Sequence, residues 1–415
     1  MRIAAVGCGH GELDTIYAAA KASERATKVP IDAVVICGDF EAIRNASDLE
    51  QVAGPKKFRK MGDFHKYYSG KTTAPYLTIV IGGNHECSSY FMELYHGGWL
   101  APNIYFLGYA GVVQLGSLRI AGVSGIYAPE HFLQGRFEHP PYTGSSDIHS
   151  VYCTRQHELI QLTQLSSAID LFLSHDWPRN ILAHADRDAA AAVYAAKPTF
   201  VPQVLNGMLG SPALEHLLMH LRPTQWLAGH MHVRVETRVA HHDNRFIAPE
   251  TADLTHFTHL PPPPLSYMLP GGPDNFGDAD PVPGVDASTT SFVGISKCVK
   301  NREFLELVDF PNHRAGPLRY DCDWLAIMAA THADLRFDSA AVAVDDLDWS
   351  DLAKRIAVCR ESIADSNLEI PTNAFAMTAP GYNPKEPAAV TEKRRAAVYV
   401  NPQTVAIRNL LGLQR

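Results

Sequence analysis

One ten-residue stretch decides the fold of this chain: Leu77-Thr78-Ile79-Val80-Ile81-Gly82-Gly83-Asn84-His85-Glu86. Its first half is apolar and rich in β-branched residues, which is typical of a strand buried on both faces. Glycines end the strand, and an amide, an imidazole and a carboxylate follow them. Because α/β folds place their functional groups at the carboxyl ends of strands, the stretch predicts an α/β protein with a site at that edge of a sheet.

The same order of an apolar strand followed by polar side chains occurs at four other places, in three of them with a Gly in the turn. The segments that we expect to be strands are Arg2–Val6, Ala33–Ile36, Leu171–Ser174 and Gln225–Ala228. The side chains that follow them are Cys8, His10, Asp39, His175, Asp176, His230 and His232. Helices predicted at Leu13–Ala22 and Phe58–Tyr68 separate the first strands, as in a layered α/β domain.

A second sheet is predicted further along the chain. Val112–Leu115 and Leu118–Ala121 lie on either side of Gly116-Ser117, which is the pattern of a β-hairpin. We expect later strands at Phe292–Lys297 and Phe304–Phe310, and helices at about Val151–Leu165, Trp324–Ala330 and Leu352–Ile363.

Composition excludes several classes of protein. The 415 residues carry 36 Lys plus Arg against 44 Asp plus Glu, a formal net charge of −8. This balance excludes a generally basic surface, so a polyanionic partner must be bound locally. Seven Cys without a C-x-x-C motif favour a reducing compartment. We find no apolar run of about 18 residues, and therefore expect a soluble intracellular protein without a membrane partner.

The side chains at the strand ends are those that hold divalent metals. Two cations about 3.5–4 Å apart can clamp the attacking and leaving oxygens of a phosphoryl displacement. Asp39 is the natural bridging carboxylate, because its two oxygens can face two ions. The remaining positions suit neutral imidazoles and an amide oxygen, from His10, His175, His230, His232 and Asn84. His230 and His232 are two residues apart, so we expect both to point to one side of an extended strand.

His85 follows a predicted ligand directly and is interpreted as a general acid. A protonated imidazole beside a phosphate can protonate the departing alkoxide. The alternative, that His85 only orients a ligand, stays open. Glu86 and Asp176 are expected to hold ligands or backbone rather than bind metal themselves.

These motifs resemble a known superfamily. The series C-x-H, G-D-F, G-N-H-E, S-H-D and G-H-M-H is similar to the calcineurin-like metallophosphoesterases, two-sheet α/β sandwiches with a dinuclear metal site. That superfamily normally opens with D-x-H, whereas this chain has Cys8 at the first position. An opening Cys resembles the RNA lariat debranching enzymes, and so do the segments Gly135–Tyr142, Ser150–Tyr152, Phe172–Pro178, Phe292–Cys298 and Tyr320–Ile327.

The resemblance implies hydrolysis of the 2′-5′ phosphodiester bond at the branch point of excised intron lariats, which gives linear RNA for turnover. It places Cys8, His10, Asp39 and His232 around one metal and Asp39, Asn84, His175 and His230 around the other. It makes His85 the acid for the leaving 2′ oxygen. It also implies a lariat recognition loop, within which or near which we expect the RNA-contacting residues to be Tyr127, Arg136, Phe137, Tyr142, Tyr152 and Arg155. A solvated helix face remains the alternative for Arg155, and a disordered surface excursion the alternative for the loop.

The predicted architecture is a two-sheet metallophosphoesterase sandwich flanked by helices, with residues 1–310 as catalytic domain and 311–415 as a smaller C-terminal domain. The recognition loop spans 125–150. Eight prolines between Pro261 and Pro283 favour an exposed linker or insertion at 258–287. A thiolate is softer than a carboxylate, so we expect Fe(II), Zn(II) or Mn(II) at the metal site and a dependence of activity on reductant.

The sequence leaves two alternative functions. A general metallophosphatase acting on phosphoproteins or small phosphoesters would not need the loop around Arg136. A non-catalytic scaffold is disfavoured because every expected ligand position holds a competent residue. Lariats arise in nuclei, so we expect a nuclear protein, with the cytoplasm as a further location. We also expect a monomer that meets splicing-related proteins, although Lys393-Arg394-Arg395 is too short to establish import.

Overall fold

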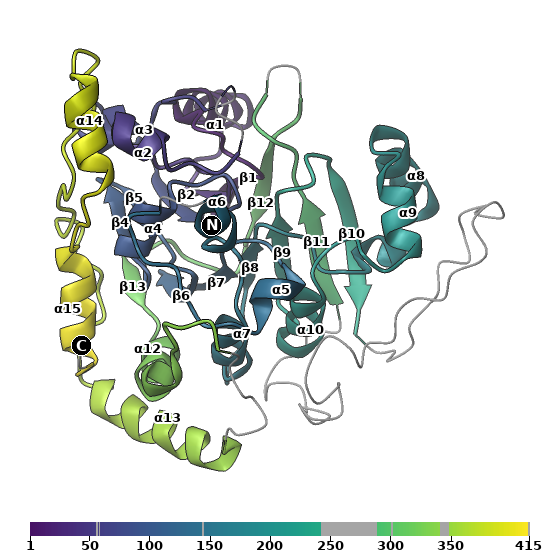
Figure 1. The fold of residues 1–415 in the computed structure, drawn as a ribbon. Helices are drawn as coiled ribbons and strands as arrows, with labels where there is room; N and C mark the ends of the chain where they lie inside the picture. The colour runs from purple at the N-terminus through teal and green to yellow at the C-terminus, as the bar shows by residue number, and fades with distance from the viewer. Residues whose placement is uncertain are drawn as a thin grey trace.

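Two β-sheets pack against each other at the centre of the molecule, and helices cover their outer faces (Figure 1). The computed structural model describes residues 1–54, 57, 59–142, 145–241, 289–299, 302–340 and 348–413. The predicted linker at 258–287 lies outside these residues. Among the described residues, no helix combines the length and apolar character needed to cross a lipid bilayer.

The first sheet has the strand order β12-β1-β2-β3-β5-β4. Its strands are β1 (Arg2–Val6), β2 (Ala33–Cys37), β3 (Leu77–Ile81), β4 (Gly98–Ala101), β5 (Ile104–Phe106) and β12 (Leu305–Asp309). β1, β2, β3 and β5 run parallel, and the edge strands β12 and β4 are antiparallel to their neighbours. The predicted bounds of β1 and β3 are confirmed.

The second sheet has the order β10-β11-β9-β8-β7-β6-β13. Its strands are β6 (Ala110–Leu115), β7 (Leu118–Val123), β8 (Leu171–Ser174), β9 (Gln225–Ala228), β10 (Val235–Ala240), β11 (Thr289–Gly294) and β13 (Leu318–Tyr320). β6 and β7 form the predicted hairpin. β7, β8, β9 and β11 are parallel, so both sheets send parallel strand ends toward one edge of the sandwich.

Alternation of side chains along the strands builds three cores. Ile3 and Ala5 of β1 point into the layer between the sheets, whereas Ala4 and Val6 point to the outer face. The outer face of the first sheet packs against α1 (Leu13–Thr27), α3 (Phe64–Tyr68) and α4 (Ser88–Glu93). The outer face of the second packs against α7 (Gln156–Thr163), α10 (Pro212–Leu221), α12 (Cys322–Thr331) and α13 (Trp349–Ile363).

Two predicted helices are shorter than expected. The structure has α3 from Phe64 where a helix from Phe58 was predicted. It has α7 from Gln156, not Val151. Arg155 is extended at φ −107° and ψ 157°, and its N–H donates to the side chain of Glu158 three residues on, so this capping box starts the helix one residue later.

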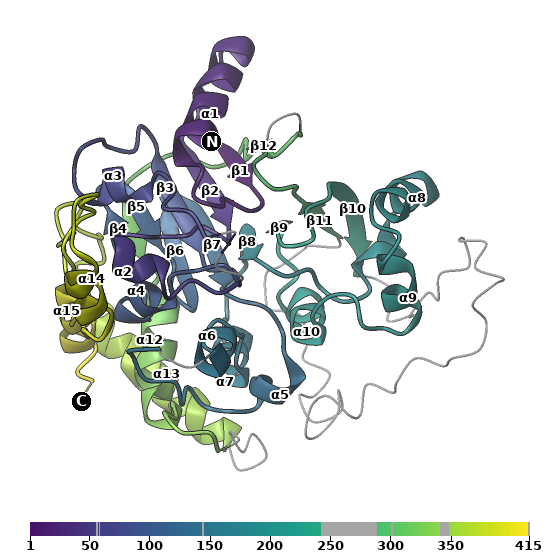
Figure 2. The same ribbon diagram turned by 45° about the horizontal axis from the view of Figure 1, so that its top comes forward.

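The chain after residue 310 contacts both sheets. β13 extends the second sheet by pairing with β6. The chain then passes through α12 and α13 to the other sheet, where α14 (Ala388–Arg395) and α15 (Pro402–Leu410) run along the side of the molecule near β4 (yellow in Figures 1 and 2). There the Gln403 amide accepts from Trp99 N at 2.7 Å and donates to Trp99 O at 3.0 Å. This side chain satisfies backbone groups of the edge strand β4.

The remaining helices are short and lie in connections. They are α2 (Ala46–Leu49), α5 (Pro129–Phe132), α6 (Ser145–Ser150), α8 (Arg187–Ala196) and α9 (Phe200–Leu205), with 3₁₀ turns at Ile181–His184 and His332–Asp334. α5 and α6 belong to the segment 125–150, and α8 and α9 follow β8 in the chain and lie beyond β10, at the edge of the second sheet (Figure 1).

Candidate metal centre

The structure brings the predicted ligands together from five strand ends. Cys8 and His10 follow β1, Asp39 follows β2, and Asn84 follows β3, while His175 and the His230/His232 pair follow β8 and β9. The two sheets each contribute, since β1–β3 belong to the first and β8 and β9 to the second. The site therefore lies where the carboxyl ends of the parallel strands of both sheets meet.

One group of donors consists of Cys8, His10, Asp39 and His232, whose donor atoms all lie within 4.8 Å of one another. His10 Nε2 is 3.4 Å from His232 Nε2 and 3.7 Å from Asp39 Oδ2. On its other side His10 Nδ1 is 3.1 Å from Glu41 Oε1. A proton shared with Glu41 at Nδ1 leaves the Nε2 lone pair for a cation.

A second group surrounds the other oxygen of Asp39. His175 Nε2 lies 3.2 Å from Asp39 Oδ1 and 3.1 Å from Asn84 Oδ1. Its Nδ1 is 2.7 Å from the carbonyl oxygen of Cys37, to which it donates. The His230 ring is 4.9 Å from the His175 ring. Asp39 thus presents Oδ2 to one group and Oδ1 to the other, as a bridging carboxylate must.

The donor set fits metal ions. Asp39 Oδ2 is buried and has no hydrogen-bond partner, an arrangement that is costly unless a cation compensates it. A thiol, four imidazoles, a carboxylate and an amide oxygen converge without an excess of negative charge. These are the ligand types that borderline divalent metals prefer.

Burial and neighbouring charges set the pKa values of the donors. Burial opposes ionisation of Asp39, but the charge and hydrogen bond of His175, helped by His10, hold its pKa well below the usual value. Burial and Lys297 lower the pKa of His232 to about 3. Burial and His175 lower that of His230. These two imidazoles are therefore neutral at pH 7, the form that binds metals.

Four of the ligands have left-handed backbone. The φ angles are 44° at His10, 45° at Asp39, 61° at His230 and 55° at His232. Non-glycine residues adopt such angles uncommonly, and strained backbone of this kind is often found at functional sites. The expectation that His230 and His232 extend a strand is wrong, because β9 ends at Ala228 and the chain turns. As a result His232 joins Cys8 and His10, while His230 lies beside His175.

Glycine is required at two positions of the site for lack of space. A Cβ on Gly83 would lie 2.3 Å from the N and Oδ1 of Asp39. One on Gly38 would lie 2.3 Å from His175 Nδ1, and Gly38 also has φ of 95°. A side chain at either glycine would therefore overlap Asp39 or His175 and displace that ligand.

His85 lies at the edge of the donor groups. Its backbone N–H donates to Asp39 Oδ1 at 2.8 Å, and its partly exposed ring is 5.8 Å from the ring of His10. Glu86 is buried and accepts from the backbone N–H groups of Phe40, Glu41 and Gly83. Burial, with Asp39 nearby, raises the pKa of Glu86 to about 8. Glu86 therefore ties the β2 and β3 turns together.

Asp176 also holds backbone. Its carboxylate accepts from Trp177 N at 2.8 Å and from Tyr127 N at 3.4 Å. It thereby connects the β8 turn, next to the ligand His175, to the start of the segment 125–150.

Known proteins resemble this chain over its full length. The calcineurin-like phosphoesterase model matches residues 1–234, and that for the C-terminal domain of lariat debranching enzymes matches residues 287–415. Lariat debranching enzyme A of Xenopus laevis is 36% identical over 422 residues, covering 100% of this chain and 70% of the relative. The lariat debranching enzyme of Schizosaccharomyces pombe is 35% identical, covering 100% of this chain and 96% of the relative.

The chain belongs to the lariat debranching enzyme family. The human member is 36% identical and is covered over 69% of its length. The family assignment makes the chain a phosphoesterase and implies divalent metal ions.

The predicted recognition loop of this debranching-family chain is packed in its described residues. Arg136 is buried, donates to Glu158 Oε1 at 2.8 Å and to Val151 O at 2.8 Å, and lies over the Tyr109 ring at 4.0 Å. Arg155 is buried and pairs with Glu138.

Three predictions of direct RNA contact need correction. Arg136 and Arg155 are occupied by buried carboxylates, and Tyr142 is only 1% exposed. None of the three presents its polar group to a substrate in this structure, and Arg155 lies on no solvated helix face. Tyr127, Phe137 and Tyr152 are partly exposed and remain candidates.

The C-terminal region, which the sequence suggested could help to position the loop, contacts it directly. The N–H of Arg136 donates to the Arg336 carbonyl at 2.8 Å, and that of Gly135 to Ala340 O at 3.2 Å. A Cβ on Gly135 would lie 2.7 Å from Arg336 and Asp338 atoms. The region beyond residue 310 thus supports the loop, a pairing of segments 200 residues apart that no local pattern signals.

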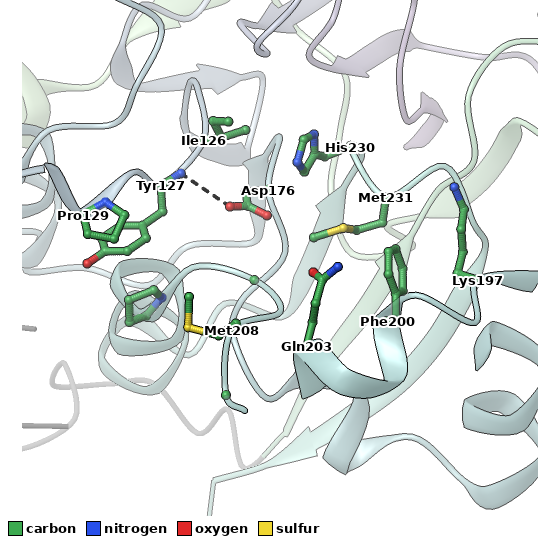
Figure 3. Close-up of a pocket in the computed structure, with 13 residues that line it drawn as sticks. Ile126, Tyr127, Pro129, Asp176, Lys197, Phe200, Gln203, Met208, His230 and Met231 are labelled. Atoms are coloured by element: carbon green, nitrogen blue, oxygen red, sulfur yellow. Dashed lines mark hydrogen bonds between the residues drawn. The ribbon is translucent and has the colours of Figure 1, made fainter. Parts of the chain in front are cut away.

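No sequence pattern predicted the pocket of about 400 Å³ that lies beside the metal centre (Figure 3). His230 and Asp176 form part of its wall, and Tyr127 of the loop faces α9 and Met231 across it. The His-rich motif marked one wall, but Phe200 and Gln203 of α9 lie in a stretch with no recognisable motif.

Proposed function

We propose that the chain hydrolyses the 2′-5′ phosphodiester bond at the branch point of excised intron lariat RNA. One observation carries the proposal. Metal donors form two groups that share Asp39, with Cys8 in one of them, in a chain that matches lariat debranching enzymes over its entire length. Family membership specifies the substrate, and the site supplies the groups that a phosphodiesterase needs.

Two divalent metal ions would be held on either side of Asp39. Cys8, His10 and His232 would complete one set of ligands, and Asn84, His175 and His230 the other. Bound there, such ions supply an activated water and neutralise charge on the phosphoryl oxygens. The buried thiol and the imidazoles support Fe(II), Zn(II) or Mn(II) rather than Mg(II).

The protein's own contribution to bond cleavage is a proton from His85. The Asp39 carboxylate accepts from the backbone N–H of His85 at 2.8 Å, so the main chain that carries the imidazole is fixed relative to the ligand set. Its ring remains partly exposed and open to a substrate. Protonation of the leaving 2′ oxygen at His85 avoids release of an unstable alkoxide.

RNA is proposed to lie across the loop 125–150. Partly exposed Tyr127, Phe137 and Tyr152 offer aromatic faces on which unpaired bases stack. Arg136 and Arg155 would act as positioning residues, since their ion pairs with Glu158 and Glu138 fix the loop from inside. We also propose a nuclear monomer, with some protein in the cytoplasm, that meets splicing-related proteins because lariats arise during splicing; imaging of the tagged chain tests the location.

Cleavage of a synthetic branched RNA with one 2′-5′ and one 3′-5′ linkage tests the function. Metal-loaded wild type should cut only the 2′-5′ bond. If neither linkage is cut while an aryl phosphate is hydrolysed, the lariat assignment fails and a general metallophosphatase takes its place.

A further inference from the structure

We infer that the pocket beside the metal centre binds the base of the nucleotide that keeps the scissile phosphate after cleavage. Phe200, Met208 and Met231 would contact this base, and Lys197 would face its phosphate side. The inference rests on the proposed function and adds to it a subsite with named residues.

The pocket has the size and lining of a site for part of a nucleotide. Its volume of about 400 Å³ falls within the range of about 300–1,000 Å³ that is usual for small-ligand sites. Phe200 and Met231 lie across the pocket from Tyr127 (Figure 3), and with Met208 they provide its apolar lining. Phe200 is 8% exposed, so only the part of its ring that faces the pocket is open to a base. Met208 is 58% exposed, which is high for so apolar a side chain and suits a contact surface.

One polar side chain is available to read the base. Gln203 lies in the pocket wall, and its Nε2 donates to Thr199 O at 3.2 Å. Its Oε1 can therefore accept from an amino or imino group of a base. Stacking against an aromatic face together with one such hydrogen bond is how single-stranded RNA is generally recognised.

A cationic rim adjoins the same wall. Lys197 lines the pocket, and Lys297 and Arg302 are close enough to lower its pKa, although burial is the larger cause. Arg302 also donates to the carbonyl of the ligand His232 at 3.1 Å. Within the described part of the chain, none of these three cations is ion-paired to a carboxylate. Unpaired cations beside a phosphoesterase centre suit the phosphates of a bound strand.

The position of His85 decides which nucleotide enters the pocket. His85 comes from the turn after β3 of the first sheet. Its ring lies against Gly54, because a Cβ at Gly54 would be 3.3 Å from that ring. The pocket is built from segments that follow β7, β8 and β9 of the second sheet. The branch nucleotide leaves on the His85 side, so the nucleotide that retains the phosphate extends toward the pocket.

The test uses metal-loaded full-length protein and two pairs of variants. Phe200→Leu keeps an apolar side chain but removes the flat ring, and Gln203→Ala removes the polar contact. Lys21→Gln, on the exposed part of α1, is the control for Lys197→Gln. The substrates are one branched RNA, the same RNA abasic at the nucleotide attached through the 2′-5′ bond, and the same RNA abasic at the branch nucleotide.

Phe200→Leu should raise KM for the intact RNA roughly 5- to 150-fold, and Gln203→Ala should raise it roughly 2- to 13-fold, both with little change in kcat. On RNA abasic at the 2′-linked nucleotide, the difference from wild type should vanish. Should it vanish only for RNA abasic at the branch nucleotide, or persist for both, the assignment is overturned. Aryl phosphate hydrolysis and circular dichroism detect a misfolded variant, and failure of wild type to debranch would refute the proposed function itself.

Discussion

His85 is fixed through its backbone, and its ring is partly exposed. Its N–H is held by Asp39 Oδ1, while its side chain belongs to neither group of ligands around Asp39. A residue held in this way can be changed without removing a metal ligand.

His85→Asn should lower kcat on branched RNA by roughly 10²- to 10⁴-fold, because the leaving oxygen loses its proton donor. Metal content, measured by elemental analysis of the purified protein, should stay at the wild-type value. A parallel loss of metal and activity would instead support the alternative that His85 orients a ligand.

Cys8 is the residue that departs from the superfamily's opening carboxylate. Its Sγ is fully buried and accepts from His230 N at 3.1 Å. Burial and the nearby Asp39 raise the pKa of this thiol well above its usual value, so thiolate formation depends on a bound cation.

Replacing the thiol by a carboxylate should change which metal the protein retains. For Cys8→Asp we expect the ratio of zinc to manganese, after dialysis against an equal mixture, to fall by about an order of magnitude, because a hard oxygen replaces a soft sulfur. Cys37→Ser, at a buried thiol outside the cluster, is the control. An unchanged ratio in Cys8→Asp would mean that the sulfur does not bind metal.

The identities of the ligands could be predicted from sequence, but their backbone could not. Polar residues after apolar strands indicated Asp39, Asn84 and His175 because strand ends converge in any parallel sheet. His10 and His232 have left-handed angles in the turns after β1 and β9, and their rings meet across the two sheets, with Nε2 atoms 3.4 Å apart. Such contacts between segments far apart in sequence leave no local pattern.

Within the loop 125–150, two buried ion pairs replace the apolar contacts of an ordinary core. Arg136 pairs with Glu158 of α7, and Arg155 pairs with Glu138, all four side chains being buried. An Arg in an aromatic, Pro-rich stretch suggests a ligand contact, and only the fold shows that its charge is already neutralised.

Arg136→Met should destabilise the protein by about 3–5 kcal/mol, because Glu158 would be left charged and buried. The double variant Arg136→Met/Glu158→Gln should recover much of this loss. The amide oxygen that it places at position 158 can still accept the hydrogen bond that the Arg155 N–H donates to Glu158 at 2.9 Å in the wild type. Urea unfolding measures both. Equal stability of the single and double variants would mean that the ion pair is not what holds the loop.

A further buried ion pair joins the C-terminal region to the second sheet. Asp321 caps α12 through Trp324 N at 3.0 Å and receives two bonds of 2.8 Å from Arg119 of β7. Burial opposes the charge of Asp321, but Arg119 outweighs it and lowers the pKa.

This lowered pKa predicts the sign of a pH effect. A depressed carboxyl pKa contributes stability above the unfolded value of about 3.9, and this contribution is lost as pH falls through the folded pKa. Asp321→Asn should reduce stability at pH 7 by about 1–3 kcal/mol and should lose less on acidification from pH 5 to 3 than wild type. Thermal unfolding measured at both pH values checks this; parallel pH slopes would contradict it.

In the molecule as a whole, the last hundred residues complete the edges of both sheets. β13 completes the second sheet, and Gln403 covers the edge of the first. The parallel strands around the site and the hairpin of β6 and β7 were predictable because they are short apolar runs between turns, whereas β4, β10 and β13 were not expected. α8 and α9 were not: only Val193 of α8 is buried, and α9 contains Pro202.

Charge is distributed unevenly over the molecule. The formal net charge is −8, which by itself repels RNA, yet Lys197, Lys297 and Arg302 adjoin the metal centre. Association with RNA must therefore depend on this local patch, and local phosphate contacts release counterions from the strand.

The affinity for branched RNA should consequently fall with salt. Three phosphate contacts predict a slope of about −2 in a plot of log association constant against log KCl, since each contributes about −0.7 for single strands. Lys297→Gln should make the slope shallower by roughly 0.7, whereas Lys21→Gln on α1 should leave it unchanged. Fluorescence anisotropy with the slow His85→Asn background measures binding without turnover. A slope near zero, or equal changes for both lysines, would show that overall charge and not this patch governs binding.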